Sequence, residues 1–155
     1  MKARRRIGAA TAVALTAAAW IAGGSAGAAG LAPYRVVGDA IPAALDGATG
    51  DASRGLKIAV DRKRGNCVAC HALPAAEATF PGDVGPSLAG VGDRLNPGQI
   101  RLRVVDQTRV VPRTVMPPYY RVEGLKDVAP EYAGKPILNA GEIEDLVAYL
   151  SSLRK

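Results

Sequence analysis

The chain has few of the residues that form metal sites and aromatic cores. Its 155 residues include two cysteines, one histidine, one phenylalanine and one tryptophan. A structural zinc site takes about four nitrogen or sulfur ligands, so cysteine and histidine alone leave such a site one ligand short. Aromatic residues make up only 5% of the chain, which is little for a hydrophobic core and favours a bound apolar group that completes it. No basic stripe is interleaved with aromatic residues, so we expect no nucleic-acid partner.

The first residues have the pattern of a secretory signal. Residues 2–6 contain four basic side chains, an apolar run follows, and Ala26-Gly27-Ala28 fits a signal-peptidase site. The run is shorter than the roughly 20 residues of a membrane-spanning helix, so we expect cleavage near Ala28, or after Ala26, rather than a retained anchor. This predicts export to the periplasm by the general secretory route. The signal holds four of the 20 basic residues and no acidic one, so its removal lowers the net charge from +6 to about +2.

Both cysteines lie in the segment Cys67-Val68-Ala69-Cys70-His71. This is the C-x-x-C-H signature of covalent c-type haem attachment. Two residues between the cysteines give one tight turn, which places both thiols within reach of the two vinyl groups of a haem. His71 would then lie beneath the ring and ligate the iron from the proximal side. The motif occurs once, so we predict one haem c, attached through Cys67 and Cys70.

Other uses of this motif fit the sequence less well. A thioredoxin-like redox pair would follow a strand in a βαβ unit, whereas residues 62–66 resemble the frayed end of a helix. A chance match in a binding module without haem remains an alternative, and such a protein would be colourless. With both cysteines attached to haem, neither is left for a disulfide.

A second iron ligand has to come from elsewhere in the sequence. The chain has no other histidine, which excludes bis-histidine ligation within it, and Met116 is its only methionine besides Met1. Pro117 and Pro118 follow Met116 and stiffen its backbone. We therefore predict His71 and Met116 as the iron ligands, an arrangement that raises the reduction potential. The alternative is a core methionine, which would leave a five-coordinate, gas-binding haem.

Apolar spacing and capping residues predict three helices, at about 52–63, 97–106 and 140–153. Each follows a residue that can cap it, namely Asp51, Asn96 and Asn139. Gly55 is costly inside a helix and is expected where another helix approaches closely. Glu144 and Asp145 lie near the positive end of the last helix and are interpreted as favourable charges there.

The remaining segments are expected to be irregular. Residues 72–84 form a loop with two prolines, and the glycine-rich run 85–92 cannot be regular structure for long. Residues 29–50 are predicted to be an N-terminal arm, flexible at 45–50, that either hangs loosely or packs on the haem domain or a partner. The expected division is therefore a signal at 1–28, an arm at 29–50 and a cytochrome domain at 51–155.

In their order along the chain, these features resemble the class I cytochrome c family. The residues that carry the resemblance are Gly55, Cys67 to His71, Gly85 to Leu88, Met116 and Tyr149. The resemblance implies an all-α fold of about three to five helices around one covalently bound haem c, with an irregular N-terminal arm. It also implies that the first and last helices cross near Gly55 and Tyr149. A further implication is that the carbonyl of Pro86 accepts a hydrogen bond from His71, which would fix the ring on the iron.

Longer stretches are similar to the SoxX family, the small monohaem subunits of SoxAX cytochromes in bacterial sulfur oxidation. These stretches are 61–67, 85–92, 116–121 and 134–138. The resemblance implies a heterodimer with a SoxA-like c-type cytochrome, which would join thiosulfate oxidatively to a cysteine of a SoxYZ-like carrier. This chain would be the non-catalytic subunit that accepts the electrons and passes them to a small soluble cytochrome c. The alternative is a free monohaem cytochrome c that shuttles electrons without a link to sulfur oxidation.

Overall fold

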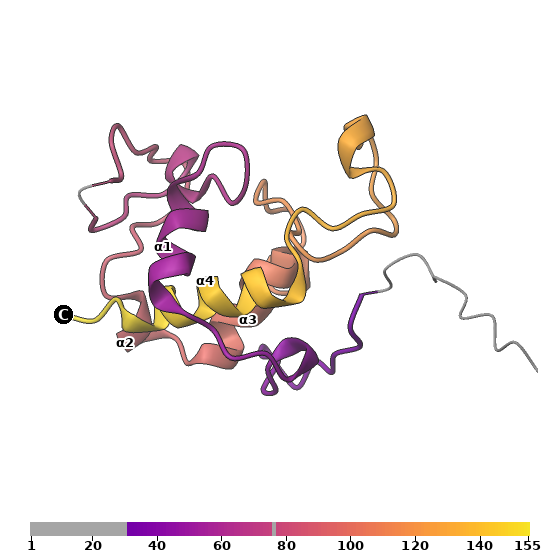
Figure 1. Cartoon of the computed structure of the whole chain (residues 1–155), viewed down its shortest axis with the longest axis horizontal. Coiled ribbons are helices and arrows are strands. Elements are labelled where there is room, and N and C mark those ends of the chain that lie inside the picture. The colour runs from indigo at the N-terminus through magenta and orange to yellow at the C-terminus, as the bar shows by residue number, and fades with distance from the viewer. Residues whose placement is uncertain (1–30, 76) are drawn as a thin grey trace, which may run out of the picture.

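The computed structural model describes residues 31–75 and 77–155, so the expected signal at 1–28 lies outside the described residues. The α-helices of the described part are α1 (Ala52–Val60), α2 (Val91–Arg94), α3 (Pro97–Asp106) and α4 (Ala140–Ser152) (Figure 1). Short 3-10 turns lie at Leu45–Gly47, Cys67–Ala69, Gln107–Arg109 and Pro130–Tyr132. The described part contains no helix with the length and apolar content that a membrane crossing requires. The expectation of an all-α fold with a few short helices is confirmed.

The helices begin where the sequence offers side-chain caps. The Asp51 carboxylate accepts hydrogen bonds from the backbone N–H groups of Ser53 and Arg54 at the start of α1. Asn96 and Asn139 each form a reciprocal capping box, with Gln99 and Glu142 respectively. These bonds satisfy donors that the first helical turn would otherwise leave unpaired.

The end of α1 differs from the expectation. The helix stops at Val60 instead of about Lys63, because Asp61 is extended and its carbonyl accepts hydrogen bonds from the following turn. The N–H of Gly65 returns to the carbonyl of Ile58 at 3.2 Å. The chain therefore reverses tightly here and enters the haem motif from a fixed turn.

The interior is built around α4, which packs against both α1 and α3 (Figure 1). Ile143 and Leu146 of α4 are 0% and 1% exposed, and Ile100 and Val105 of α3 are 2% and 0% exposed. Helix α1 crosses α4 at the buried Gly55, as the family resemblance implied. This crossing holds the residues before the haem motif against the C-terminal helix.

The glycine-rich run 85–92 is regular only at its end, as expected of a stretch that cannot be regular structure for long. Its last two residues, Val91 and Gly92, open helix α2. Gly90 adopts a φ of 65° before the helix, and a Cβ atom on Gly92 would overlap the Ser151 carbonyl of α4. The short helix forms because glycine allows both the left-handed turn and close packing on α4.

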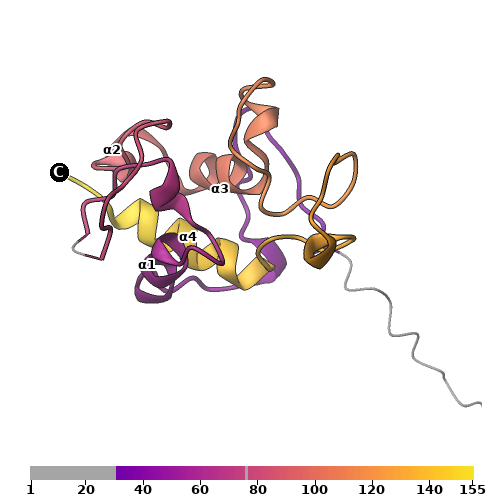
Figure 2. The ribbon, with the colours of Figure 1, turned by 90° about the horizontal axis from the view of Figure 1, so that it is seen from above.

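The N-terminal arm is packed on the domain along α3 and α4 (Figure 2). Ile41 and Leu45 are each 1% exposed. The N–H of Ile41 donates to the carbonyl of Gly98 in α3 at 2.9 Å, and the N–H of Leu45 donates to the Glu144 carboxylate in α4 at 3.0 Å. The expectation of a flexible run at 45–50 is therefore wrong at Leu45, because its side chain and its N–H both have partners in the core.

Candidate functional site

A tight turn presents the cysteines and the histidine of the C-x-x-C-H motif. Asn66 has a φ of 48°, and the chain then forms the 3-10 turn Cys67–Ala69. The carbonyl of Cys67 accepts hydrogen bonds from the N–H of Cys70 at 3.2 Å and from the N–H of His71 at 2.9 Å. One peptide oxygen thereby holds Cys70 and His71 next to Cys67, as the spacing of the motif requires.

The His71 imidazole is held by the loop that contains Pro86. The distance between Nδ1 of His71 and the carbonyl oxygen of Pro86 is 2.7 Å. A proline carbonyl can only accept, so Nδ1 carries the proton and Nε2 is left free to ligate a metal. Gly85 lies against the ring, where any Cβ atom would overlap the imidazole. The proximity of this loop thus fixes both the tautomer and the position of the ring.

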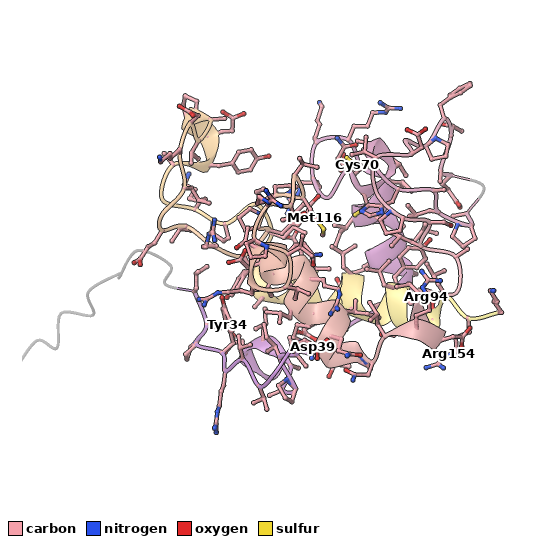
Figure 3. All side chains as sticks on the ribbon, turned by 180° about the vertical axis from the view of Figure 1, so that it is seen from behind. Tyr34, Asp39, Cys70, Arg94, Met116 and Arg154 are labelled. Carbon is pink, nitrogen blue, oxygen red and sulfur yellow. The ribbon has the colours of Figure 1, made fainter. Side chains whose placement is uncertain are left out.

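Met116 reaches the same region from the other half of the sequence. Its N–H donates to the hydroxyl of Thr114 at 3.1 Å, and its side chain is half-buried. Met116 and Cys70 lie in the same part of the molecule (Figure 3). The five predicted site residues line one cavity of about 480 Å³, a size typical of cofactor sites. They are Cys67, Cys70, His71, Pro86 and Met116.

The rest of the cavity lining is mostly apolar, with a few polar groups that the sequence reasoning missed. Apolar side chains come from Leu88, Val91, Leu95, Ile100, Val104 and Leu150. Arg94 and Arg103 also line the cavity, and the Arg94 guanidinium is fixed by hydrogen bonds to the carbonyls of Ser87 and Ala89. Residues 100, 103, 104 and 107 share one face of a helix, and this i, i+3, i+4, i+7 spacing is the sequence signal that could have found them.

The state of the cysteines argues against a redox pair or a zinc site. Burial raises the pKa of the Cys67 thiol to about 11, whereas reactive and metal-binding cysteines have lowered pKa values. Among the described residues, no three His, Cys, Asp or Glu side chains gather closely enough to hold a metal ion. A large flat group with its own metal, attached through the thiols, fits this site: the cavity is apolar, and one imidazole and one thioether line it.

Comparison with known proteins identifies relatives of the chain. The family model for cytochrome c matches residues 52–154. No curated protein matches the chain. Among solved structures, the chain is similar to one described as SoxXA from P. pantotrophus, with 38% sequence identity and a TM-score of 0.73. This match covers 79% of the chain described here and 95% of the other chain.

Proposed function

The chain belongs to the cytochrome c family as a SoxX-type member with covalently bound haem c, and from this premise we propose that it is the electron-transfer subunit of a SoxAX-like complex. The observation that carries the proposal is the cavity in which both thiols, the imidazole and the thioether meet. The similarity to a SoxXA chain supports the assignment to a complex rather than to a free shuttle.

The chain's own residues define how a haem would be held. Cys67 and Cys70 would bind one haem as thioethers, and His71 and Met116 would ligate its iron. Haem iron supplies a reversible one-electron couple whose potential depends on its axial ligands and its burial. His71 is oriented by Pro86, and the apolar lining from α3 would shield a bound haem from water. With its iron ligated by both side chains, the haem would have no position left for a substrate, so this subunit would transfer electrons without binding the sulfur compound.

The catalytic step would belong to the partner. A SoxA-like cytochrome would couple thiosulfate oxidatively to a cysteine of a SoxYZ-like carrier protein. Two electrons leave when the sulfur–sulfur bond forms, and this chain would accept them one at a time and pass each to a small soluble cytochrome c. Location in the periplasm, after removal of the signal at 1–28, fits both this division of labour and covalent attachment of haem.

The test is the native mass and haem content of the protein purified from the periplasm of its own host. We expect a 1:1 complex with a larger c-type cytochrome, in which this chain contributes one haem. In that complex, thiosulfate should reduce the haem of this chain only when the carrier protein is present. The isolated chain, given thiosulfate and carrier, is the control and should stay oxidised.

Two other outcomes have clear meanings. Elution as a single-haem monomer beside the candidate partner would show a free electron shuttle and overturn the proposed complex. Carbon monoxide binding to the reduced, unmodified protein would instead show an open iron position, as in a gas-binding cytochrome in which Met116 is only a core residue.

A further inference from the structure

Tyr119 connects the segment that carries Met116 to the segment that carries the haem motif. Its side chain is 7% exposed and lines the haem cavity. Its hydroxyl donates to the carbonyl of Gly65 at 2.6 Å, across 54 positions in the sequence. The backbone N–H of Tyr119 donates to Val104 in α3 at 3.3 Å, and its carbonyl accepts from Leu138 at 3.1 Å. One buried residue thus joins three parts of the fold at the edge of the cavity.

The acceptor of this bond is rigid. Gly65 is buried, and its N–H donates to the carbonyl of Ile58. A Cβ atom on Gly65 would lie 2.6 Å from that same carbonyl oxygen. Asn66, with its positive φ, follows directly and leads into Cys67. The Gly65 carbonyl therefore has a fixed position relative to the first haem-attachment residue, and it cannot move to follow a displaced donor.

The donor is also rigidly connected to the predicted iron ligand. Only Pro117 and Pro118 separate Met116 from Tyr119, and each proline fixes one backbone dihedral. A shift of Tyr119 would therefore carry Met116 with it. A thioether is a weak iron ligand, so its bond depends on how well the protein holds it in place.

From these contacts we infer that Tyr119 is a positioning residue, whose hydrogen bond to Gly65 sets the distance between the haem-attachment segment and the axial Met116. The inference rests on the proposed ligation of one haem by His71 and Met116. It goes beyond that proposal because it assigns a role to a side chain that ligates nothing. Burial also raises the pKa of the Tyr119 hydroxyl, which favours its protonated, hydrogen-bond-donating form.

The neighbouring tyrosine provides a matched control. Tyr120 is 3% exposed, and its hydroxyl accepts a hydrogen bond from the N–H of Ala32 in the arm at 2.7 Å. Tyr120 is absent from the cavity lining. The substitutions Tyr119→Phe and Tyr120→Phe therefore remove the same atom from adjacent buried residues, but only the first removes a bond between the two haem-binding segments.

The experiment measures imidazole binding to the ferric protein, with haem attached and the SoxA-like partner present. Imidazole competes with the methionine sulfur, and its binding is followed by loss of the red charge-transfer band of methionine-ligated ferric haem. We expect Tyr119→Phe to raise imidazole affinity by about three- to tenfold, the worth of one hydrogen bond. Tyr120→Phe should leave that affinity unchanged, even though we expect urea unfolding to show a comparable loss of stability in both variants.

The outcomes separate this inference from the proposed function. Equal imidazole affinity in Tyr119→Phe and the unmodified protein would overturn the positioning role while leaving methionine ligation intact. An equal rise in both variants would also overturn it, because general loosening of the fold would then explain the effect. If the unmodified protein lacks the charge-transfer band, methionine ligation itself fails, and the role of Tyr119 fails with it.

Discussion

The Cβ position of Gly55 lies 2.7 Å from the Cβ atom of Tyr149, at the point where α1 crosses α4. A side chain on Gly55 would also overlap the backbone carbonyl of Asp145. Backbone atoms cannot yield as a flexible side chain can, so Gly55→Ala should force the two helices apart. We expect a loss of about 1–3 kcal/mol in the free energy of unfolding, typical of an overpacked core. Urea titration of the haem-loaded protein measures it.

Gly141 is the control for this substitution. It lies in the first turn of α4, and a Cβ atom there would meet only the Asn139 side chain, at an ordinary 3.4 Å. Gly141→Ala should be neutral or slightly stabilising, because alanine favours a helix more than glycine does. If both variants lost stability equally, the helix crossing would not be the reason.

Gly85 lies against the His71 ring, and this contact predicts a defect in the haem site rather than in the fold. A methyl group from Gly85→Ala would overlap the imidazole and push it away from the Pro86 carbonyl. We expect a weaker iron–histidine bond, and therefore a lower yield of haem-loaded protein with a shifted reduction potential. Gly124→Ala is the control, because Gly124 has no atom near its Cβ position, and its strained φ should cost stability without a change in that potential.

Met116→Ala tests the predicted axial ligand directly. Removal of the thioether should abolish the red charge-transfer band and lower the reduction potential. It should also let carbon monoxide bind the reduced iron, because no described methionine or histidine other than Met116 and His71 lines the cavity. Val111→Ala is the control, since Val111 is 46% exposed, lies close in sequence and does not line the cavity. Unchanged spectra in Met116→Ala would remove Met116 from the iron site and leave it as a core residue.

The sequence was sufficient to predict the helices and the haem motif because both depend on short-range spacing. Capping residues and apolar periodicity gave α1, α3 and α4 to within a few residues but missed the short α2, and the crossing at Gly55 that the family resemblance implied is confirmed. The hydrogen bond between His71 and Pro86 followed from the family resemblance, since no local pattern links residues 15 positions apart. The ligand roles of His71 and Met116 stay predictions, although the structure brings both side chains to one cavity.

The burial of two charged residues in α4 could not be predicted from short-range sequence spacing. Glu144 and Asp145 were interpreted only as favourable charges near the positive end of a helix, and the structure shows that they are also buried, at 4% and 5% exposed. Their partners, Arg101 and Arg54, lie on other helices, 43 and 91 positions away. Helical periodicity marks such residues as polar and outward-facing, because it contains no information about a cation that arrives from a distant part of the chain.

The pair of Arg101 and Glu144 ties the arm to the core, so its loss should be costly. Arg101 donates two hydrogen bonds to Glu144 at 2.7 Å and a third to the carbonyl of Ile41, while Glu144 also accepts from the N–H of Leu45. Glu144→Ala leaves a guanidinium buried without its counter-ion. We expect a loss of about 3–5 kcal/mol in urea unfolding, together with faster proteolysis of the arm.

Two further variants test whether the loss of stability is specific to the buried pair of Arg101 and Glu144. Arg154→Ala removes an exposed pair with Asp93 and should cost less than about 1 kcal/mol. The apolar double variant Arg101→Met/Glu144→Leu should recover only part of the loss, because the Ile41 carbonyl and the Leu45 N–H would remain buried without partners. Full recovery would show that these backbone bonds to the arm contribute nothing.

Asp145 should make the stability of the protein depend on pH in the acid range. Its carboxylate accepts two hydrogen bonds from Arg54 and one from the N–H of Asp51. The Arg54 bonds are the main reason that the pKa of Asp145 is lowered, and burial, together with the like charge of Asp51, opposes them only in part. Because the folded pKa is below the unfolded value of about 4, Asp145 stabilises the fold above that pH. This contribution is lost as the pH falls through the folded pKa.

The measurement is the urea midpoint of the haem-loaded protein between neutral pH and about pH 3, a range that spans the unfolded pKa of aspartate. Asp145→Asn should be less stable than the unmodified protein at neutral pH, and the difference should shrink as the pH falls below about 4, because the protonated carboxyl then resembles the amide. Asp83→Asn, at an exposed position in the 72–84 loop, should follow the unmodified protein throughout. The difference in urea midpoint between Asp145→Asn and the unmodified protein could instead persist undiminished at low pH. That result would mean that Asp145 stabilises the crossing of α1 and α4 through its shape and hydrogen bonds, and not through its charge.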